Sequence, residues 1–254
     1  MTPIRLVIAG GCGRMGQAIA RGALQDPAFN VAAILEADGH AALGSAYSAV
    51  LGQAVTPELR VASEARAAIS QGDVLIEFTA PEATVAHAQL AQELRKPMVI
   101  GTTGLTPQHQ AALAAAARAI PIVVSPNMSL GVNVLFELAQ AAAKRLGPSY
   151  DVEVIESHHR HKKDAPSGTA KRLAEALAAA RGMPPEKIPV HAVRAGDIVG
   201  DHTVILAGPS ERLELTHRAH HRDVFAQGAL RAAQFVATQK PGLYDMSHVL
   251  GAGR

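Results

Sequence analysis

The N-terminal segment constrains the fold of this chain more than any other. Residues 4–9 form a short apolar run with Val and Ile, which is typical of a buried parallel strand. The run continues into glycines spaced G-x-x-G-x-x-G and then into residues 17–24, which we predict to be a helix. Gly10 would allow the tight turn, Gly13 the close approach of backbone to a pyrophosphate, and Gly16 the close packing of helix on strand. This order predicts a dinucleotide-binding βαβ unit.

A second apolar run, residues 31–36, ends in an acid. Glu36 lies 20 positions after Gly16, where a carboxylate meets the adenosine ribose hydroxyls in sites of this kind. A glycine triplet alone is a weak signal, and the alternative is a tight strand–helix turn with no ligand. The succession of strand, glycines, helix, strand and acid favours the dinucleotide.

Composition narrows the fold class and the partners. Hydrophobic residues make up 48% of the 254 residues but aromatic residues only 3%, with no Trp, so the core is built from Ala, Val, Leu and Ile. Such a core suits parallel α/β layers. The net charge is +2 with His neutral, and this near balance of acids and bases argues against nucleic acid as a partner.

The same counts bear on the cellular compartment. The single Cys12 excludes an intramolecular disulfide and fits a reducing environment. Arg5 interrupts the apolar start, so we expect no signal peptide. No apolar run reaches about 18 residues, so we expect no membrane span. A cytoplasmic protein is the resulting expectation.

Two domains are predicted. Residues 1–128 alternate between strand-like and helix-like segments, which implies a Rossmann-like parallel sheet with helices on both faces. Residues 129–237 change to an α+β pattern, with a mixed or antiparallel sheet, and form a substrate-binding and oligomerisation domain. Residues 238–254 are expected to return to the first domain. Ligands bind at the carboxyl ends of parallel strands, where three small or polar turns follow predicted strands, at Thr79, residues 101–103 and residues 125–128.

The most unusual segment is a histidine block, residues 156–170. It holds three His, one Arg and two Lys in six consecutive positions, 158–163. Cations this close repel one another unless an anion lies among them. His titrates nearest neutral pH, and Lys becomes a usable proton donor when neighbouring cations lower its pKa. Ser167, Gly168 and Thr169 then resemble a helix start, where a carboxylate binds readily. The alternative is a solvated charged loop.

A metal site is a further alternative for these histidines. His217, His220 and His221 form a second group that could join the first. The spacing has neither a paired helical His with a Glu nor a Cys ligand, and the neighbouring Arg and Lys would repel a divalent cation. We therefore predict no metal.

Together these motifs resemble the 4-hydroxy-tetrahydrodipicolinate reductase (dihydrodipicolinate reductase) family over the whole chain. The segments that carry the resemblance are residues 10–16, 101–104, 127–133, 194–200 and 242–246, and above all the histidine block. The resemblance implies an enzyme of the diaminopimelate route to lysine. Such an enzyme uses NADH or NADPH to deliver hydride to C4 of a small cyclic imine with two carboxylates, as water is lost.

The resemblance also implies residue roles and an assembly. His158 would be the acid/base residue, Lys162 the proton donor and His159 a substrate contact. Gly168 and Thr169 would bind a substrate carboxylate. The implied oligomer is a homotetramer built through the sheet of the second domain. The implied cofactor contacts are Gly10, Gly11, Cys12, Gly13, Arg14, Met15, Glu36, Gly101, Thr102, Thr103, Ser125, Pro126, Asn127 and Met128.

One departure from the family bears on the cofactor. Members that use NADPH well often have Arg directly after the ribose acid, and this chain has Ala37. Arg14 could still reach a 2′-phosphate. We therefore expect NADH to be used at least as well as NADPH.

Two rival functions are another Rossmann-type oxidoreductase and a pseudo-reductase that binds the cofactor without turnover. The only Cys lies in the glycine turn, which argues against an aldehyde dehydrogenase, and the His158/Lys162 pair argues against a pseudo-reductase.

Overall fold

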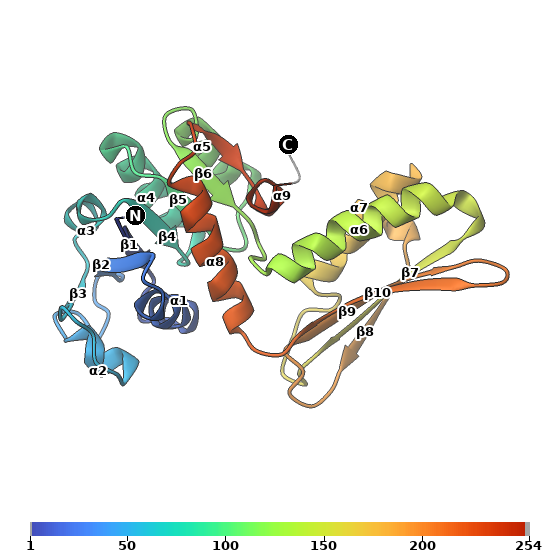
Figure 1. Cartoon of the computed structure of the whole chain (residues 1–254), viewed down its shortest axis with the longest axis horizontal. Helices are drawn as coiled ribbons and strands as arrows, with labels where there is room; N and C mark the ends of the chain where they lie inside the picture. Colours follow the sequence, from blue (N-terminus) through green and yellow to red (C-terminus); the bar gives the residue numbers. More distant parts are fainter. Residues whose placement is uncertain (1, 252–254) are drawn as a thin grey trace. The chain divides into compact units, whose positions relative to one another are not determined.

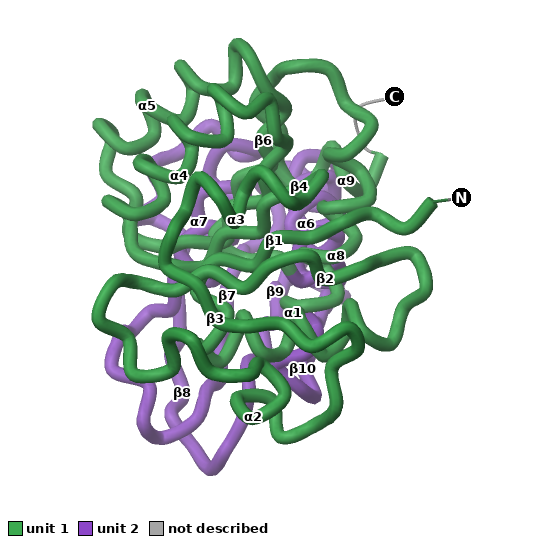
Figure 2. The backbone as a smooth tube through the Cα atoms, turned by 90° about the vertical axis from the view of Figure 1, so that its left-hand side faces the viewer, with its two compact units in different colours: residues 1–128, 225–254 green, residues 129–224 purple. Residues whose placement is uncertain are grey.

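The computed structural model describes residues 2–251, which separate into two compact units (Figures 1 and 2). Unit 1 is Met1–Met128 with Phe225–Arg254, and unit 2 is Ser129–Val224. Residues 1 and 252–254, which belong to the predicted first domain, lie outside the described part. Residues 225–237 belong to unit 1, although they were predicted to belong to the second domain.

Within residues 2–251, unit 1 contains a seven-stranded sheet in the order β11-β6-β5-β4-β1-β2-β3. Every pairing in it is parallel. The chain leaves β3 at one edge and crosses to β4 on the other side of β1, so the switch point where ligands bind in such sheets lies between β1 and β4. The strands are β1 (Ile4–Ala9), β2 (Phe29–Leu35), β3 (Val61–Ala62), β4 (Val74–Glu77), β5 (Met98–Ile100), β6 (Pro121–Val124) and β11 (Gly242–Tyr244).

The helices of unit 1 cover this sheet in two groups. Helices α3, α4 and α5 pack against one another, and α1 lies beside α8, where Gly22 faces Leu230 (Figure 1). Helix α8 also contacts the end of the first segment, because a Cβ at Gly228 would lie 1.7 Å from the carbonyl oxygen of Met128. The helices are α1 (Arg14–Gln25), α2 (Tyr47–Leu51), α3 (Ala65–Gln71), α4 (Pro81–Leu94), α5 (Pro107–Ala116), α8 (Asp223–Val236) and α9 (Met246–Leu250).

Unit 2 contains a four-stranded mixed sheet in the order β10-β9-β7-β8. Its elements are α6 (Leu130–Leu146), η1 (Gly147–Ser149), β7 (Asp151–His158), α7 (Gly168–Arg181), η2 (Pro185–Lys187), β8 (Val190–Arg194), β9 (Gly200–Ala207) and β10 (Arg212–Ala219). Strand β9 pairs antiparallel with β7 and β10. Strand β8 pairs parallel with β7, so the sheet is mixed, which is one of the two arrangements predicted for this domain. The reason is that α7 lies between β7 and β8 in the chain and serves as the crossover that parallel neighbours need.

The core of unit 2 lies between its sheet and helices α6 and α7, which lie on one face of the sheet (Figure 1). Strand β7 alternates between buried and partly exposed residues along its length, as a strand with one covered face should. The fold class predicted from the sequence, a Rossmann-like parallel domain followed by an α+β domain with a mixed sheet, is confirmed. Among the described residues, no helix is both long and apolar enough to cross a membrane.

Candidate active site

The glycine turn of unit 1 joins β1 to α1 at the switch point of the sheet. Gly10 has a φ of 72°, and a Cβ there would lie 2.6 Å from the carbonyl oxygen of Phe78 at the end of β4. A Cβ at Gly16 would lie 2.2 Å from the carbonyl oxygen of Gly10. Glycine at position 10 therefore lets the turn approach the end of β4, and glycine at position 16 lets α1 pack closely on the turn.

This turn fits a dinucleotide pyrophosphate. The N-cap of α1 is Gly13, which provides no side-chain cap, so the backbone N–H groups of the first turn point out of the helix end. These groups and the helix dipole attract an anion. The predicted contacts Gly11, Cys12, Arg14 and Met15 lie along the same turn and helix start.

Glu36 follows β2 and is anchored to the glycine turn. One carboxylate oxygen accepts a hydrogen bond from the Cys12 backbone N–H at 3.0 Å, and the other accepts one from Ala37 N–H at 3.2 Å. Each oxygen retains a lone pair, so the carboxylate can also accept ribose hydroxyls. Burial and the Glu36 charge raise the pKa of the Cys12 thiol to about 11. The thiol is therefore protonated at neutral pH and is not a nucleophile.

The ends of β4 and β5 form a second wall at this edge of the sheet. A Cβ at Gly101 would lie 2.2 Å from the Phe78 ring, so only glycine lets that ring approach. Thr102 is buried, and its hydroxyl lies 2.8 Å from that of Thr84 on α4, while Thr103 is exposed. The turn after β5 therefore consists of small residues, and a flat cofactor ring can approach its backbone.

The turn after β6 holds the remaining predicted cofactor contacts. The Ser125 hydroxyl donates to the Asn127 carbonyl oxygen at 2.8 Å, which closes the turn. Pro126 is exposed and Met128 is buried. The structure therefore places every predicted cofactor residue in unit 1, along the carboxyl edge of one parallel sheet and the glycine turn beside it.

Sequence reasoning did not single out Glu77, which lies fully buried at the end of β4. Its carboxylate accepts a hydrogen bond from the Thr79 hydroxyl and lies 2.7 Å from Nδ1 of His87 on α4. The carboxylate thereby fixes the turn that follows β4. An acid at the end of an otherwise apolar strand is the signal that could have found it.

Unit 2 builds its polar centre around Glu156, whose side chain is 0% exposed. The carboxylate accepts two hydrogen bonds from Arg194, both at 2.8 Å, and one from the Ser167 backbone N–H at 3.0 Å. It also bonds Nδ1 of His158. Burial alone would raise the pKa of Glu156, but the bonds from Arg194, His158 and Ser167 lower it below its ordinary value. Glu156 is therefore an anion held by four hydrogen bonds from three residues.

His158, at the end of β7, is oriented by this carboxylate. Because Nδ1 faces Glu156, the proton of the neutral ring lies on Nδ1 and the lone pair on Nε2. A Cβ at Gly200 would lie 3.1 Å from Nε2, so glycine there leaves room around this atom. Burial lowers the pKa of His158 although Glu156 opposes the shift, and the Lys162 charge lowers it further. The neutral ring with a free base at Nε2 is thus favoured.

Lys162 lies in the loop after β7 and is ion-paired with Asp164. The distance from Nζ to a carboxylate oxygen of Asp164 is 2.8 Å, and the Lys162 side chain is 23% exposed. Arg194 donates to the backbone carbonyl of the same Asp164 at 2.6 Å. Arg194 therefore ties the Lys162 loop to the Glu156 centre.

Helix α7 begins directly beside Glu156. Its N-cap Ser167 accepts a hydrogen bond from Ala170 N–H through the side chain, while its own N–H is held by Glu156. Gly168 is exposed with open space where a Cβ would be, and Thr169 is partly exposed. His159 is partly exposed in the adjoining loop. The predicted substrate residues thus lie around the start of α7 and the end of β7.

His202 on β9 is a further member of this site that sequence reasoning missed. Its ring lies edge-on to that of His158, with centroids 5.2 Å apart, and its Nε2 lies 3.3 Å from the Ser167 hydroxyl. Burial and the nearby His158 charge lower the pKa of His202 to about 4. Within residues 2–251, its buried Nδ1 has no hydrogen-bond partner. This atom is available to a ligand.

Two family models match the chain. "Dihydrodipicolinate reductase, N-terminus" matches residues 4–128, and "Dihydrodipicolinate reductase, C-terminus" matches residues 131–250. A 4-hydroxy-tetrahydrodipicolinate reductase of Nitrosomonas europaea is 43% identical over 268 residues, covering 99% of each chain. One of Myxococcus xanthus is 46% identical over 272 residues, again covering 99% of each.

Solved structures agree with this similarity. A dipicolinate-bound dihydrodipicolinate reductase from Paenisporosarcina sp. TG-14 superimposes with a TM-score of 0.78 at 27% identity, covering 96% of this chain and 97% of that one. A diaminopimelate dehydrogenase of C. glutamicum, at 12% identity and a TM-score of 0.61, covers 98% of this chain and 96% of its own, and shares the fold.

Proposed function

The chain belongs to the dihydrodipicolinate reductase family, and from that premise we propose how its residues carry out the reaction. It is an NAD(P)H-dependent oxidoreductase that reduces 4-hydroxy-tetrahydrodipicolinate in the diaminopimelate route to lysine. Unit 1 holds the dinucleotide on the glycine turn and Glu36, and unit 2 binds the substrate and supplies its proton. The observation that carries the proposal is the Glu156 centre, which orients His158 and ties down the Lys162 loop.

The substrate carries two carboxylates, and unit 2 offers charges that suit them. The histidine block carries Arg160, Lys162 and Lys163 in the loop that leads from β7 to the exposed start of α7. A carboxylate at Gly168 and Thr169 would meet backbone N–H groups and the positive end of the helix dipole. His159 and Nδ1 of His202 add further donors nearby. A dianion therefore offsets the mutual repulsion of these cations, which selects a small dicarboxylate over a neutral molecule.

Proton handling falls to His158 and Lys162. When bound, the reduced nicotinamide supplies hydride to C4 of the substrate. Lys162, as an ammonium, donates the accompanying proton, and its pairing with Asp164 holds the ammonium in place before it does so. His158 presents Nε2 as an acid or base, with Glu156 stabilising the imidazolium whenever Nε2 takes a proton. Negative charge that develops on the substrate is stabilised by the surrounding cations.

A binding experiment tests the substrate site without turnover. Dipicolinate, the planar analogue named with the Paenisporosarcina structure, is titrated calorimetrically into the wild type, His159→Ala and His161→Ala. We expect His159→Ala to weaken binding about tenfold, because a donor to a carboxylate contributes roughly 1–2 kcal/mol. His161 is exposed and serves as the matched control, so its variant should bind within about twofold of wild type. Equal losses in both variants would mean that only the general charge of the block matters.

The finer assembly is also a proposal. The face of the unit 2 sheet opposite α6 and α7 carries apolar side chains, including Val193 on β8, which is 42% exposed, and the partly exposed Ile155 on β7 and Ile205 on β9. This face supports a homotetramer formed through the sheet, in a cytoplasmic enzyme. Sedimentation analysis of wild type and of Val193→Lys tests it. A tetramer that the variant dissociates supports this face as the interface, and a wild-type monomer contradicts it.

A further inference from the structure

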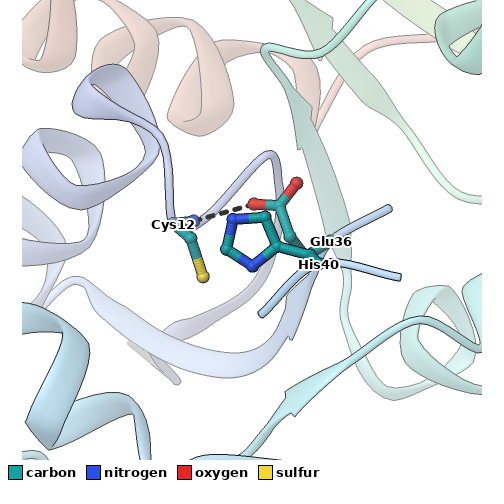
Figure 3. A group of neighbouring side chains, drawn as sticks. All are labelled: Cys12, Glu36 and His40. Atoms are coloured by element: carbon teal, nitrogen blue, oxygen red, sulfur yellow. Dashed lines mark hydrogen bonds between the residues drawn. The ribbon is translucent and has the colours of Figure 1, made fainter. Parts of the chain in front are cut away.

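One peptide unit of the glycine turn is held at both ends by side chains from elsewhere in unit 1. Its carbonyl oxygen, on Gly11, accepts a hydrogen bond from the Tyr47 hydroxyl at 2.7 Å. Its N–H, on Cys12, donates to the Glu36 carboxylate at 3.0 Å. Figure 3 shows this second bond, with His40 beside the two residues. The glycine spacing and the family resemblance assigned no role to Tyr47.

Tyr47 reaches the turn from the start of α2. Its side chain is 0% exposed, and it lies 36 positions after Gly11 in the chain. A buried Tyr hydroxyl needs a hydrogen-bond partner, because an unpaired polar group loses its hydration without compensation. Burial raises the pKa of Tyr47, so the phenol remains protonated and donates. Tyr47 is therefore a constant donor to the Gly11 carbonyl.

The other end of α2 is linked to the same turn through α1. Arg21 donates to the Leu51 carbonyl, at the end of α2, and to the Gln17 side chain, both at 3.1 Å. Gln17 in turn donates to the Cys12 carbonyl at 2.8 Å. Helix α2 is thus connected to the glycine turn from both of its ends.

The orientation of the Gly11–Cys12 peptide decides what the turn presents beside Glu36. In a planar trans peptide the C=O and the N–H point in opposite directions, so a donor on the carbonyl keeps the N–H on the Glu36 side. Glycine has no Cβ to restrict rotation of this peptide unit. Rotation by half a turn would aim the carbonyl oxygen at the Glu36 carboxylate. That carboxylate would then lose one of the two backbone N–H bonds that hold it.

We propose that Tyr47 is a positioning residue for the dinucleotide. By holding the Gly11–Cys12 peptide, it keeps the Glu36 carboxylate where it accepts the adenosine ribose hydroxyls. The proposal rests on the proposed function of unit 1, in which Glu36 binds that ribose. Because Tyr47 is 0% exposed, it acts through the turn and not by contact with the ligand. Its removal should therefore change cofactor affinity and leave proton transfer in unit 2 unchanged.

Tyr47→Phe tests the proposal, because it removes the hydroxyl while the ring still fills the same space. Dissociation constants are measured for NADH by nicotinamide fluorescence, and for ADP-ribose, which has the adenosine ribose and pyrophosphate without nicotinamide, by calorimetry. We expect both to bind about fivefold to tenfold more weakly, the equivalent of one hydrogen bond. The KM for NADH should rise by a similar factor, while kcat at saturating NADH stays within about twofold of wild type.

Tyr244→Phe is the matched control. The Tyr244 hydroxyl also donates to a backbone carbonyl of unit 1, that of Lys240, at 3.0 Å. This variant loses the same chemical group away from the glycine turn, so it should bind NADH within about twofold of wild type. Amide hydrogen exchange at Cys12, measured without ligand, should be faster in Tyr47→Phe than in Tyr244→Phe. Equal exchange rates and equal affinities in the two variants would overturn the role of Tyr47.

A double-mutant cycle with Glu36→Ala separates positioning from a general loss of stability. If Tyr47 acts through the carboxylate, adding Tyr47→Phe to Glu36→Ala should weaken ADP-ribose binding by less than about twofold. A loss of about fivefold in both backgrounds would show that the effect does not pass through Glu36, and would overturn the positioning role. Failure of wild type to bind NADH would overturn the proposed function of unit 1, and this inference with it.

Discussion

Replacing Glu156 with Gln tests the polar centre of unit 2 with the smallest change in shape. The substitution removes one negative charge and converts one acceptor oxygen into an NH2 donor. Glu156 is 0% exposed and accepts bonds from Arg194, Ser167 and His158. Whichever way the new amide turns, its NH2 group faces an N–H of either Arg194 or His158.

The cost to stability follows from these contacts. Removing one partner of a buried ion pair costs about 3–5 kcal/mol. The Arg194 side chain is 18% exposed, and Gln retains one acceptor, so we expect a loss of about 2–4 kcal/mol in the free energy of unfolding. If the amide NH2 faces Nδ1 of His158, the ring proton moves to Nε2 and the base is lost. We therefore expect kcat to fall by about a hundredfold or more.

Glu153→Gln is the matched control. Glu153 lies on the same strand, three residues earlier, and its pair with His191 is exposed. Surface pairs contribute at most about 1 kcal/mol, so this variant should unfold and turn over much like wild type. Urea unfolding and steady-state kinetics of both variants give the comparison. A Glu156→Gln protein as stable and as active as Glu153→Gln would refute the account of unit 2.

Three other predictions concern single sites. Lys162→Ala should lower kcat about a hundredfold or more with a smaller change in KM, whereas a variant of its exposed neighbour, Lys163→Ala, should keep most of the activity. Equal kcat values for the two variants would show that Lys162 is not the proton donor. Gly16→Ala should abolish dinucleotide binding measured by fluorescence, because its Cβ would lie 2.2 Å from a carbonyl oxygen. Gly22→Ala should still bind the dinucleotide, because its Cβ would meet only the flexible end of Leu230, at 3.0 Å. The pKa of His202 is lowered to about 4 in the folded protein, so between about pH 6.5 and about pH 4 the unfolded chain binds a proton that the folded chain does not. The free energy of unfolding should therefore fall by about 3 kcal/mol as the pH drops through this range. Urea unfolding should show a shallower pH dependence for His202→Gln than for wild type, and identical slopes would contradict this assignment.

Local patterns in the sequence predicted the elements that depend on local residues. The apolar run of β1, the glycines after it and the acid after β2 lie within 36 residues of the start, and each has a direct steric or chemical reason. The structure bears out β1, α1 and β2 as elements. By contrast, no helix or strand was predicted within residues 37–72. Strand β3 has two residues and α2 has five, which is too short for a hydrophobic period to appear.

The histidine block was conspicuous, but its organising residue was not. Glu156 and Arg194 are separated by 38 positions, and their contact arises because β8 pairs parallel with β7. The predicted sheet was mixed or antiparallel, which left the neighbours of β7 open, so this pairing could not have been inferred. One signal was present: Glu156 occupies a buried position in the alternation of β7, between Val154 and His158. A charged residue on the covered face of a strand requires partners from elsewhere in the fold.

A coupled assay tests the central claim most directly. Pyruvate and aspartate semialdehyde are converted by a dihydrodipicolinate synthase, this protein is added, and the absorbance of NADH and of NADPH is followed separately, with Lys162→Ala as the control. The account predicts oxidation that depends on the synthase product, uses NADH at least as well as NADPH near neutral pH, and collapses in the variant. Folded wild type that binds NADH but oxidises neither cofactor would contradict the claim that this protein is the reductase. The cofactor site would then be assigned correctly, but the substrate would not.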